Sequence, residues 1–443
     1  MDLDRLNDLA LSSARKLGAE DAVALTASNH DRMIRFANNS VTVVNQVEEA
    51  EMMVYLAKDK RRAIASTSNL EHSNIRRFVT DLFASLKGLP PAEYVALPDK
   101  ARKYSPDASG FDRRIDRAGS ELPEMAKTAI SASLKAGGKR SAGVIQASTV
   151  SYSILTSNGT RGSDKRTSIT LNIRSFAAND ASGHGLSCSS TFAGFHPGEA
   201  GERAGSDAKK MVQASAPEPG SYQVLLSPTV AANIVESVSG SASAFSVDAG
   251  TSYLAEKIGK RVASRSFSLT DHGIAKGGLG GRRFDDEGMP TQSTKIIDGG
   301  VLKSYLHNLT TAKKWKTATT GSAGLVVPHD WNLEVGAGDS SYDEMVREMR
   351  RGVILTSNWY TRFKNYRTGE FSTVPRDGAY LVERGKIVKP LKGMRAGDDL
   401  QRILSSIQLL SRDRTWVEWW EVSTPTLCPW ILVDGVKITR AYE

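Results

Sequence analysis

The sequence predicts an α+β protein in two parts: an N-terminal α/β domain with helices and an antiparallel sheet over residues 1–216, and a β-rich C-terminal domain over residues 217–443. Two observations support this prediction. In the first part, segments with apolar residues three and four positions apart, typical of helices, alternate with strand-like runs. In the second part, short strand-like runs are separated by glycine turns. Pro217, Pro219 and Gly220 mark the boundary between the two parts.

Four helices are expected in the first part. The first two candidates carry a stripe of apolar residues, and the stripe is clearest from Ile75 to Leu86. Gly18, Gly88 and Gly137 follow three of the candidates, at the position where a glycine commonly ends a helix. Pro90-Pro91 also prevent the second helix from continuing. The expected helices are residues 3–17, 75–86, 121–135 and 198–214.

Strands are expected between these helices. Asn38-Asn39 and Ser157-Asn158-Gly159 are typical of hairpin turns. Between residues 168 and 176, apolar and polar residues alternate, which predicts one buried face and one wet face. Residues 90–118 are polar and irregular, and we expect a linker or a surface loop. The expected strands are residues 21–27, 32–36, 40–48, 51–57, 62–66, 142–148, 150–156 and 168–176.

The second part begins with a strand and a helix and then consists mostly of short strands. Glycine pairs or clusters at residues 277–281, 299–300 and 336–338 predict the turns between them. One late helix is expected over residues 398–410, because Leu400, Ile403, Leu404 and Ile407 share a stripe. The other expected elements are a strand over 222–226, a helix over 228–243, and strands over 352–356, 378–382 and 431–433.

Composition excludes several classes of protein. No apolar run approaches the roughly 18 residues of a membrane-spanning helix, and the first residues, MDLDRLND, do not resemble a signal peptide. Two cysteines are too few for a disulfide framework. The chain has 58 basic and 49 acidic residues among 443, and this mild excess of +9 argues against nucleic-acid binding. A cytoplasmic protein is expected.

The usual catalytic motifs are missing. The seven histidines include no pair within five residues, whereas a helical zinc site needs two imidazoles on one face. Gly277 to Gly281 with Arg282-Arg283 could hold an anion, but a flexible turn is favoured. Asp285-Asp286-Glu287 could bind a cation, but a solvated acidic turn is favoured. His184 and Cys188 would lie about 13 Å apart along a strand, so a buried, inert thiol is expected.

Longer motifs resemble the TldD/TldE (PmbA) family, once described as a modulator of DNA gyrase. Residues 285–291 and 298–306 are similar to the family's D-D-E-G-x-P-T and N-G-x-L-x-x-Y-L segments. Residues 366–372 resemble its T-G-D-F-S segment, and residues 378–387 resemble its G-A-x-x-I-E-N-G-x-I segment. The match covers nearly the whole chain and is strongest in the second part. It implies a barrel-like C-terminal domain of the TldD/PmbA type.

The family has two kinds of subunit, and the resemblance implies the TldE type. TldD-type subunits carry H-E-x-x-x-H on a helix and are metallopeptidases. Counting back from Gly250-Thr251-Ser252 places Glu236 at the position of the catalytic acid, and Val235 and Gly240 at the positions of the histidines. Glu236 is therefore expected to be vestigial. No metal or cofactor is expected in this chain, and zinc is expected in the partner.

The resemblance implies a noncatalytic subunit that closes the chamber of a TldD/TldE complex acting on unfolded peptides. The implied partner is a TldD-type subunit in a heterodimer, and a homodimer stays open. One segment with a strong family match supplies candidates for the peptide channel or the subunit contact: Tyr366, Arg367, Gly369, Phe371 and Ser372. A β-turn needed only for folding is the alternative for this segment.

Two other functions remain as alternatives. One is a DNA- or gyrase-associated binding protein, whose binding would weaken steeply with salt. The other is a self-sufficient metallopeptidase that assembles an atypical metal site from scattered histidine and acidic residues. Metal analysis of the purified chain distinguishes the second alternative.

Overall fold

The first part of the chain forms one antiparallel sheet. The computed structural model describes residues 1–441 except 93–96, 99 and 105–109, so part of the predicted irregular segment lies outside the described residues. The sheet has six strands in the order β3-β2-β1-β4-β5-β6. Its strands are β1 (Asp21–Ala37), β2 (Ser40–Lys58), β3 (Arg61–Thr67), β4 (Arg140–Thr156), β5 (Arg161–Ala178) and β6 (Ala181–Ser189).

Several strands are longer than the sequence predicted. The two short strands expected on either side of His30 are one continuous strand, because β1 pairs with β2 from Asp21↔Ala57 to Ala37↔Ser40. Polar residues interrupt the apolar alternation, but their backbone groups keep the hydrogen-bond ladder intact. The turn at Asn38-Asn39 is confirmed, and both residues have positive φ, 51° and 65°.

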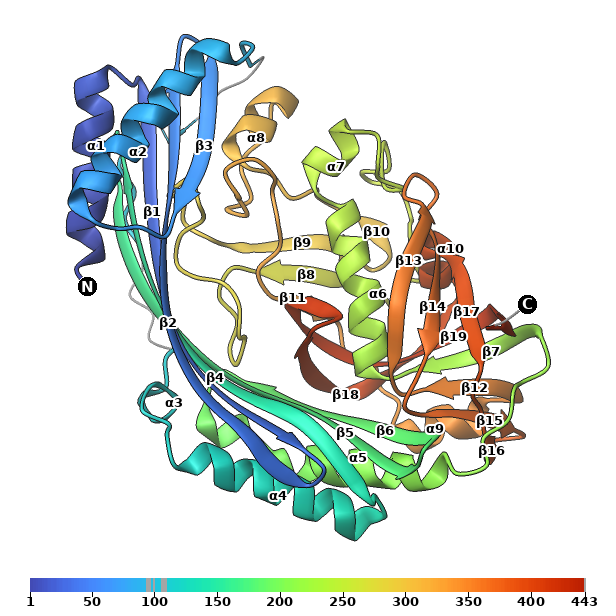
Figure 1. Cartoon of the computed structure of the whole chain (residues 1–443). Helices are drawn as coiled ribbons and strands as arrows, with labels where there is room; N and C mark the ends of the chain where they lie inside the picture. The colour runs from blue at the N-terminus through green and yellow to red at the C-terminus, as the bar shows by residue number, and fades with distance from the viewer. Residues whose placement is uncertain (93–96, 99, 105–109, 442–443) are drawn as a thin grey trace.

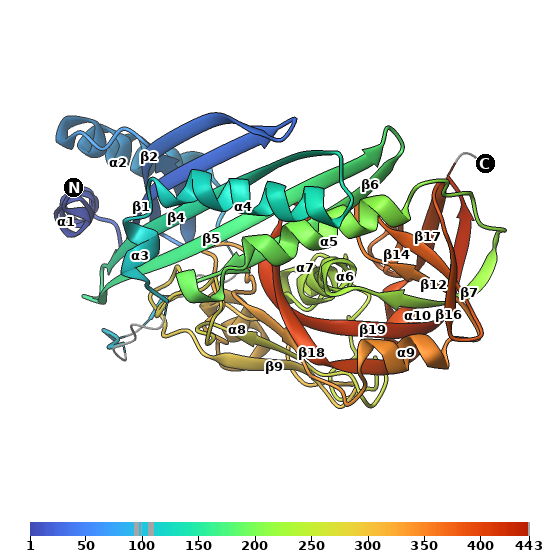
Figure 2. The same ribbon diagram turned by 90° about the horizontal axis from the view of Figure 1, so that it is seen from below.

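The four helices predicted in this part are confirmed, although α5 ends at Lys210 and not at residue 214 as predicted. They are α1 (Leu3–Leu17), α2 (His72–Ser85), α4 (Glu121–Ala136) and α5 (Pro197–Lys210). Gly18 and Gly137 end α1 and α4 in the left-handed conformation that glycine accepts without steric cost. A short helix, α3 (Arg113–Asp116), was not predicted. The long helices lie along the outer side of the bent sheet (Figures 1 and 2).

The inner face of the sheet packs against the second part of the chain. Ala22 and Ala24 of β1 pack in the cluster with α1 and α2, whereas Val23 and Leu25 pack with Phe284 from the second part. The face of β5 that was expected to be wet is half-buried for the same reason. Figure 1 shows the sheet curving around the strand-rich part.

A central helix, α6 (Pro228–Ser241), organises the second part (Figure 1). Strands of the second sheet surround it: β7 (Gly220–Leu226), β8 (Leu269–His272), β9 (Ser293–Asp298), β10 (Val301–Leu302), β11 (Leu333–Val335), β12 (Arg351–Leu355), β13 (Asn358–Asn365), β14 (Glu370–Pro375), β15 (Ala379–Glu383), β16 (Lys386–Pro390), β17 (Met394–Asp399), β18 (Ile407–Trp419) and β19 (Val422–Arg440). The smaller helices are α7 (Ala244–Asp248), α8 (Leu309–Trp315), α9 (Tyr342–Glu348) and α10 (Leu400–Ser405).

The predicted α+β class with a strand-rich second part is confirmed. The domain division at residues 216 and 217 stays a prediction; the second sheet begins at Gly220. The late helix is wrong in its extent, because α10 ends at Ser405 and Ile407 already pairs with Val433 of β19. Among the described residues, no helix combines the length and the apolar character that crossing a membrane requires.

Candidate functional site

The position implied for a metal motif lies on α6. Ser227 caps this helix by accepting a hydrogen bond from the Val230 N–H at 3.3 Å, and Pro228 occupies its first turn, where a missing N–H costs nothing. Most of the side chains of α6 are buried among the surrounding strands. The helix therefore has a fixed orientation, and its polar residues meet defined neighbours.

Glu236 points from α6 at the start of β19. Its Oε1 accepts hydrogen bonds from the Ser423 N–H at 2.9 Å, the Thr424 N–H at 2.8 Å and the Ser423 hydroxyl at 2.5 Å. Burial raises the pKa of the Glu236 carboxyl above its ordinary value, with a smaller contribution from the neighbouring Asp330. These contacts make Glu236 an anchor for the chain that enters β19.

The residues around Glu236 do not fit a zinc ion. Val235 has a buried aliphatic side chain and Gly240 has none, so neither can supply the nitrogen, sulfur or oxygen ligand that zinc requires. In the described part of the chain, no three His, Cys, Asp or Glu side chains converge in a way that could hold a metal ion. The carboxylate of Glu236 instead satisfies protein donors.

A second polar residue of α6, missed in the sequence, has a similar role. Asn233 is 6% exposed, and its Nδ2 donates to the Glu421 carbonyl at 2.6 Å. Its Oδ1 accepts from Asn358 at 2.9 Å and from Thr361 at 2.5 Å, both on β13. Only the packing of α6 against β13 and β19 reveals this network, because the residues are up to 188 positions apart.

The five candidates between residues 366 and 372 do not converge on one point. Tyr366 is 60% exposed and stacks on Phe363, with ring centroids 5.1 Å apart. Arg367 instead donates from Nε to the Gly250 carbonyl at 2.8 Å. Gly369 is buried with φ of +73°, and a Cβ there would lie 3.2 Å from Tyr253 and from Leu400. The backbone conformation and the close packing therefore require a glycine at position 369, which is consistent with the β-turn alternative for this position.

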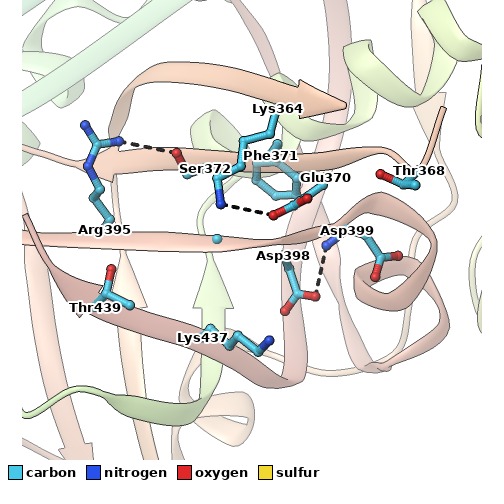
Figure 3. A pocket seen from close by; sticks show the side chains of 11 residues that line it. Lys364, Thr368, Glu370, Phe371, Ser372, Arg395, Asp398, Asp399, Lys437 and Thr439 are labelled. Atoms are coloured by element: carbon cyan, nitrogen blue, oxygen red, sulfur yellow. Dashed lines mark hydrogen bonds and ion pairs between the residues drawn. The ribbon is translucent and has the colours of Figure 1, made fainter. Parts of the chain in front are cut away.

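Phe371 and Ser372 line a surface cleft of about 630 Å³ between β14, β17 and β19 (Figure 3). The side chain of Arg395 donates to the Ser372 hydroxyl at 3.3 Å, and Lys364 pairs with Glu370 at 3.0 Å. Basic and acidic side chains line the cleft together, and the side chain that contacts the Ser372 hydroxyl is Arg395, which is not a general base. The cleft suits polar contacts rather than covalent chemistry.

The carboxylates of Asp285 and Glu287 are buried, so the predicted solvated turn is wrong. Asp285 Oδ1 accepts from the backbone N–H groups of Glu287 at 3.0 Å and Met289 at 2.8 Å. Glu287 Oε2 accepts from the Leu309 N–H at 2.8 Å. Burial raises the pKa of Asp285 to about 7, and burial together with Asp285 raises the pKa of Glu287 well above its ordinary value. Strands of the first part cover this turn, which local sequence does not show.

The glycine turn before these acids is not an open anion site. Arg282 is 5% exposed, forms an ion pair with Asp286, and lies over the rings of Tyr152 and Trp331 at 4.8 and 5.2 Å. The Gly280 N–H donates to Asn332 Oδ1 at 3.0 Å. The contact of Arg282 with Tyr152 connects the two parts of the molecule, and the other contacts lie within the second part.

Cys188 is confirmed as a buried thiol. Its Sγ donates to the Trp416 carbonyl at 3.1 Å, and burial raises its pKa above the ordinary value. His184 on the same strand has other partners: Asn172 Oδ1 lies 3.0 Å from its Nε2 and the Ser357 hydroxyl lies 3.3 Å from its Nδ1. His184 and Cys188 therefore do not form a Cys–His pair.

Comparison with family models shows which protein family the chain belongs to. A family model described as the PmbA/TldA metallopeptidase C-terminal domain matches residues 219–440, and one described as the central domain matches residues 101–212. The chain belongs to the TldD/PmbA metallopeptidase family. The family expectation drawn from the motifs is thereby confirmed.

Individual relatives match over shorter segments. A metalloprotease of Methanocaldococcus jannaschii is 30% identical over 216 residues, which are 46% of this chain and 47% of that protein. A TldD homolog of Haemophilus influenzae is 32% identical over 143 residues, or 31% of this chain and 29% of the relative. The chain thus spans about half or less of the length of these curated relatives.

Solved structures share the fold over nearly the full chain. TldE from Thermococcus kodakarensis superposes with a TM-score of 0.87 at 18% identity, covering 98% of this chain and 100% of that one. A Thermotoga maritima protein described as a modulator of a DNA gyrase has a TM-score of 0.86 at 23% identity, with coverage of 98% and 100%. At these identities the likeness establishes the fold.

Proposed function

We propose that this chain is the noncatalytic, TldE-like subunit of a cytoplasmic TldD/TldE metallopeptidase complex, in which it closes a chamber where unfolded peptides are degraded or processed. The partner is a TldD-type subunit in a heterodimer, and that subunit carries the zinc. The single observation that carries this proposal is the set of residues that α6 presents at the expected position of the metal motif. Family resemblance places a metal-binding motif there, but the helix presents Val235, Gly240 and a Glu236 that is hydrogen-bonded to β19.

Chemistry explains why this helix favours a supporting role. A zinc peptidase needs converging ligands that lower the pKa of a bound water and a carboxylate that takes its proton. Glu236 supplies a carboxylate, but one of its oxygens already accepts hydrogen bonds from two backbone N–H groups and a hydroxyl. The matching TldE fold from Thermococcus kodakarensis supports the assignment to this type of subunit.

The test is reconstitution with a TldD-type subunit that contains H-E-x-x-x-H. Co-expression should yield a complex that elutes as one species in size-exclusion chromatography and cleaves an unstructured fluorogenic peptide. The isolated chain should not cleave the peptide, and a chelator should abolish cleavage by the pair.

The matched control is the same pair with both partner histidines replaced by alanine, which should assemble without cleaving. Stoichiometric zinc in the isolated chain, together with chelator-sensitive cleavage, would contradict the proposal and favour a self-sufficient metallopeptidase.

A further inference from the structure

A cavity of about 310 Å³ lies between the two parts of the molecule, away from Glu236. Residues of α5 and β6 form one wall, and residues of the α6 N-terminus, β15, β18 and β19 form the other. Its size falls at the lower end of the roughly 300–1,000 Å³ of small-molecule sites. Nothing in the proposed peptidase role uses this cavity.

Acidic and basic side chains of helix α5 line the cavity. Arg203, Asp207 and Lys210 recur at four- and three-residue steps, which places them on one face of the helix, and all three line the cavity. Asp207 is 8% exposed and accepts a hydrogen bond from the Tyr380 hydroxyl at 2.7 Å. Burial raises the pKa of this carboxyl, so its charged form lacks full compensation within the protein.

The two cations beside Asp207 are exposed, and their charges partly offset the effect of burial on the pKa of the Asp207 carboxyl. Among the residues that the structure describes, neither Arg203 nor Lys210 forms an ion pair, with Asp207 or with any other acid. The first turn of α6 also faces the cavity through Ser227 and Thr229, and a helix N-terminus adds partial positive charge. His184 adds no charge at neutral pH, because burial lowers its pKa to about 4.

Apolar side chains contribute to the rest of the wall, beside hydroxyl-bearing side chains such as Ser227 and Thr415. Leu186 of β6 and Val417 of β18 face the cavity, together with Trp430 of β19, whose ring packs against Tyr342 with centroids 4.8 Å apart. A ligand therefore meets the charged residues of α5 together with apolar side chains from both walls. One acid and two bases in the lining complement a ligand that carries both an ammonium group and a carboxylate group.

We propose that this cavity binds a free α-amino acid with an apolar side chain. The ammonium group pairs with the Asp207 carboxylate, and the carboxylate group lies toward Arg203 and Lys210. The side chain packs against Leu186, Val417 and Trp430. The cavity lies within one chain, so the inference does not depend on the proposed peptidase role.

The experiment is calorimetric titration of the full chain with L-leucine and L-phenylalanine. We expect saturable 1:1 binding of each amino acid with a Kd below about 10 mM. N-acetyl-L-leucine lacks the ammonium group and L-leucinamide lacks the carboxylate, so each should bind about tenfold or more weakly than leucine.

Two variants test the residues. Asp207→Asn keeps an oxygen that can accept from Tyr380 and should still fold, yet it should weaken leucine binding about tenfold or more; Arg203→Ala should do the same. Lys209→Ala, on the same helix but outside the cavity, is the matched control and should bind as the parent chain does.

Three outcomes would overturn the inference. The first is no saturable binding of either amino acid up to about 10 mM. The second is binding that Asp207→Asn and Arg203→Ala leave unchanged. The third is equal binding of N-acetyl-L-leucine and leucine, which would indicate a site for carboxylates in general.

Discussion

At the scale of single residues, Glu236 shows how a carboxylate can keep its position and serve a structural purpose. Its Oε1 accepts three hydrogen bonds from Ser423 and Thr424, which orient the start of β19. A glutamine retains an oxygen for the same donors, whereas an alanine leaves them without this partner. The two substitutions therefore separate a structural role from a catalytic one.

Glu236→Gln should change peptide cleavage by the reconstituted pair less than twofold, because the amide oxygen still accepts from β19 while no proton transfer depends on it. Glu236→Ala should lower the free energy of unfolding by about 1 kcal/mol. Cleavage assays and urea denaturation measure the two effects. A loss of about 10²-fold in cleavage for Glu236→Gln, with folding intact, would mark this residue as a general base.

The buried pair Asp285 and Glu287 predicts a pH dependence of stability. Burial raises both folded-state pKa values, to about 7 for Asp285. Between the unfolded-state and folded-state pKa values, the folded chain holds protons that the unfolded chain has released. This contribution to stability is therefore complete below about pH 4 and is lost as the pH rises through 7.

Glu287→Gln should flatten this dependence, because it removes one of the two carboxyls while keeping an acceptor for the Leu309 N–H. We expect its thermal midpoint to fall less than that of the parent chain between pH 5 and pH 8, measured by circular dichroism. Asp298→Asn, at an exposed carboxyl, is the control and should follow the parent curve. Parallel curves for Glu287→Gln and the parent chain would contradict this account.

At the scale of elements, the sequence predicts what local patterns determine. Periodic apolar stripes located α1 and α2, and terminal glycines located the ends of α1 and α4, whereas α2 ends at Ser85, before the predicted Gly88. The late helix fails because Ile407 and Leu410 fit a helical stripe and a buried strand equally well, and pairing with β19 decides between them. The partners of Glu236, and the Ala323 N–H that donates to Asp285 Oδ2 at 3.2 Å, were not predictable either, since they come from distant segments that only the fold brings together.

Close packing of α5 against its neighbours supplies a prediction at this scale. A Cβ at Gly201 would lie 2.0 Å from the Ala129 carbonyl oxygen of α4, so Gly201→Ala must push the two helices apart. We expect a loss of about 1–3 kcal/mol in the free energy of unfolding, measured by urea denaturation.

Gly198 on the same helix offers the matched control. A Cβ at Gly198 would lie 3.8 Å from Thr128, an ordinary contact, so Gly198→Ala should be neutral or slightly stabilising. Equal stability of the Gly201→Ala and Gly198→Ala variants would show that the helix contact is looser than the structure indicates.

At the scale of the whole molecule, the inner face of the first sheet binds the second part through both apolar and charged groups. Phe284 packs with Val23 and Leu25, and Arg174 pairs with Asp377 at 2.6 Å. Because the inner face of the first sheet is covered within the chain, the proposed partner subunit has to contact other surfaces. Tyr366, on the turn between β13 and β14, is such a surface residue.

Tyr366→Ala tests whether residues 366–372 contact the TldD-type partner. The side chain is 60% exposed and packs on the half-buried ring of Phe363, so its removal should change the stability of the isolated chain by less than about 1 kcal/mol. An exposed aromatic that becomes buried in an interface often contributes about 2 kcal/mol or more, so affinity for the partner should fall about tenfold or more. Surface plasmon resonance with the immobilised partner measures this change.

Val388→Ala, at a 53% exposed position on β16, is the control and should bind as the parent chain does. Unchanged affinity for Tyr366→Ala would place the subunit contact elsewhere and leave this segment with its turn-forming role alone.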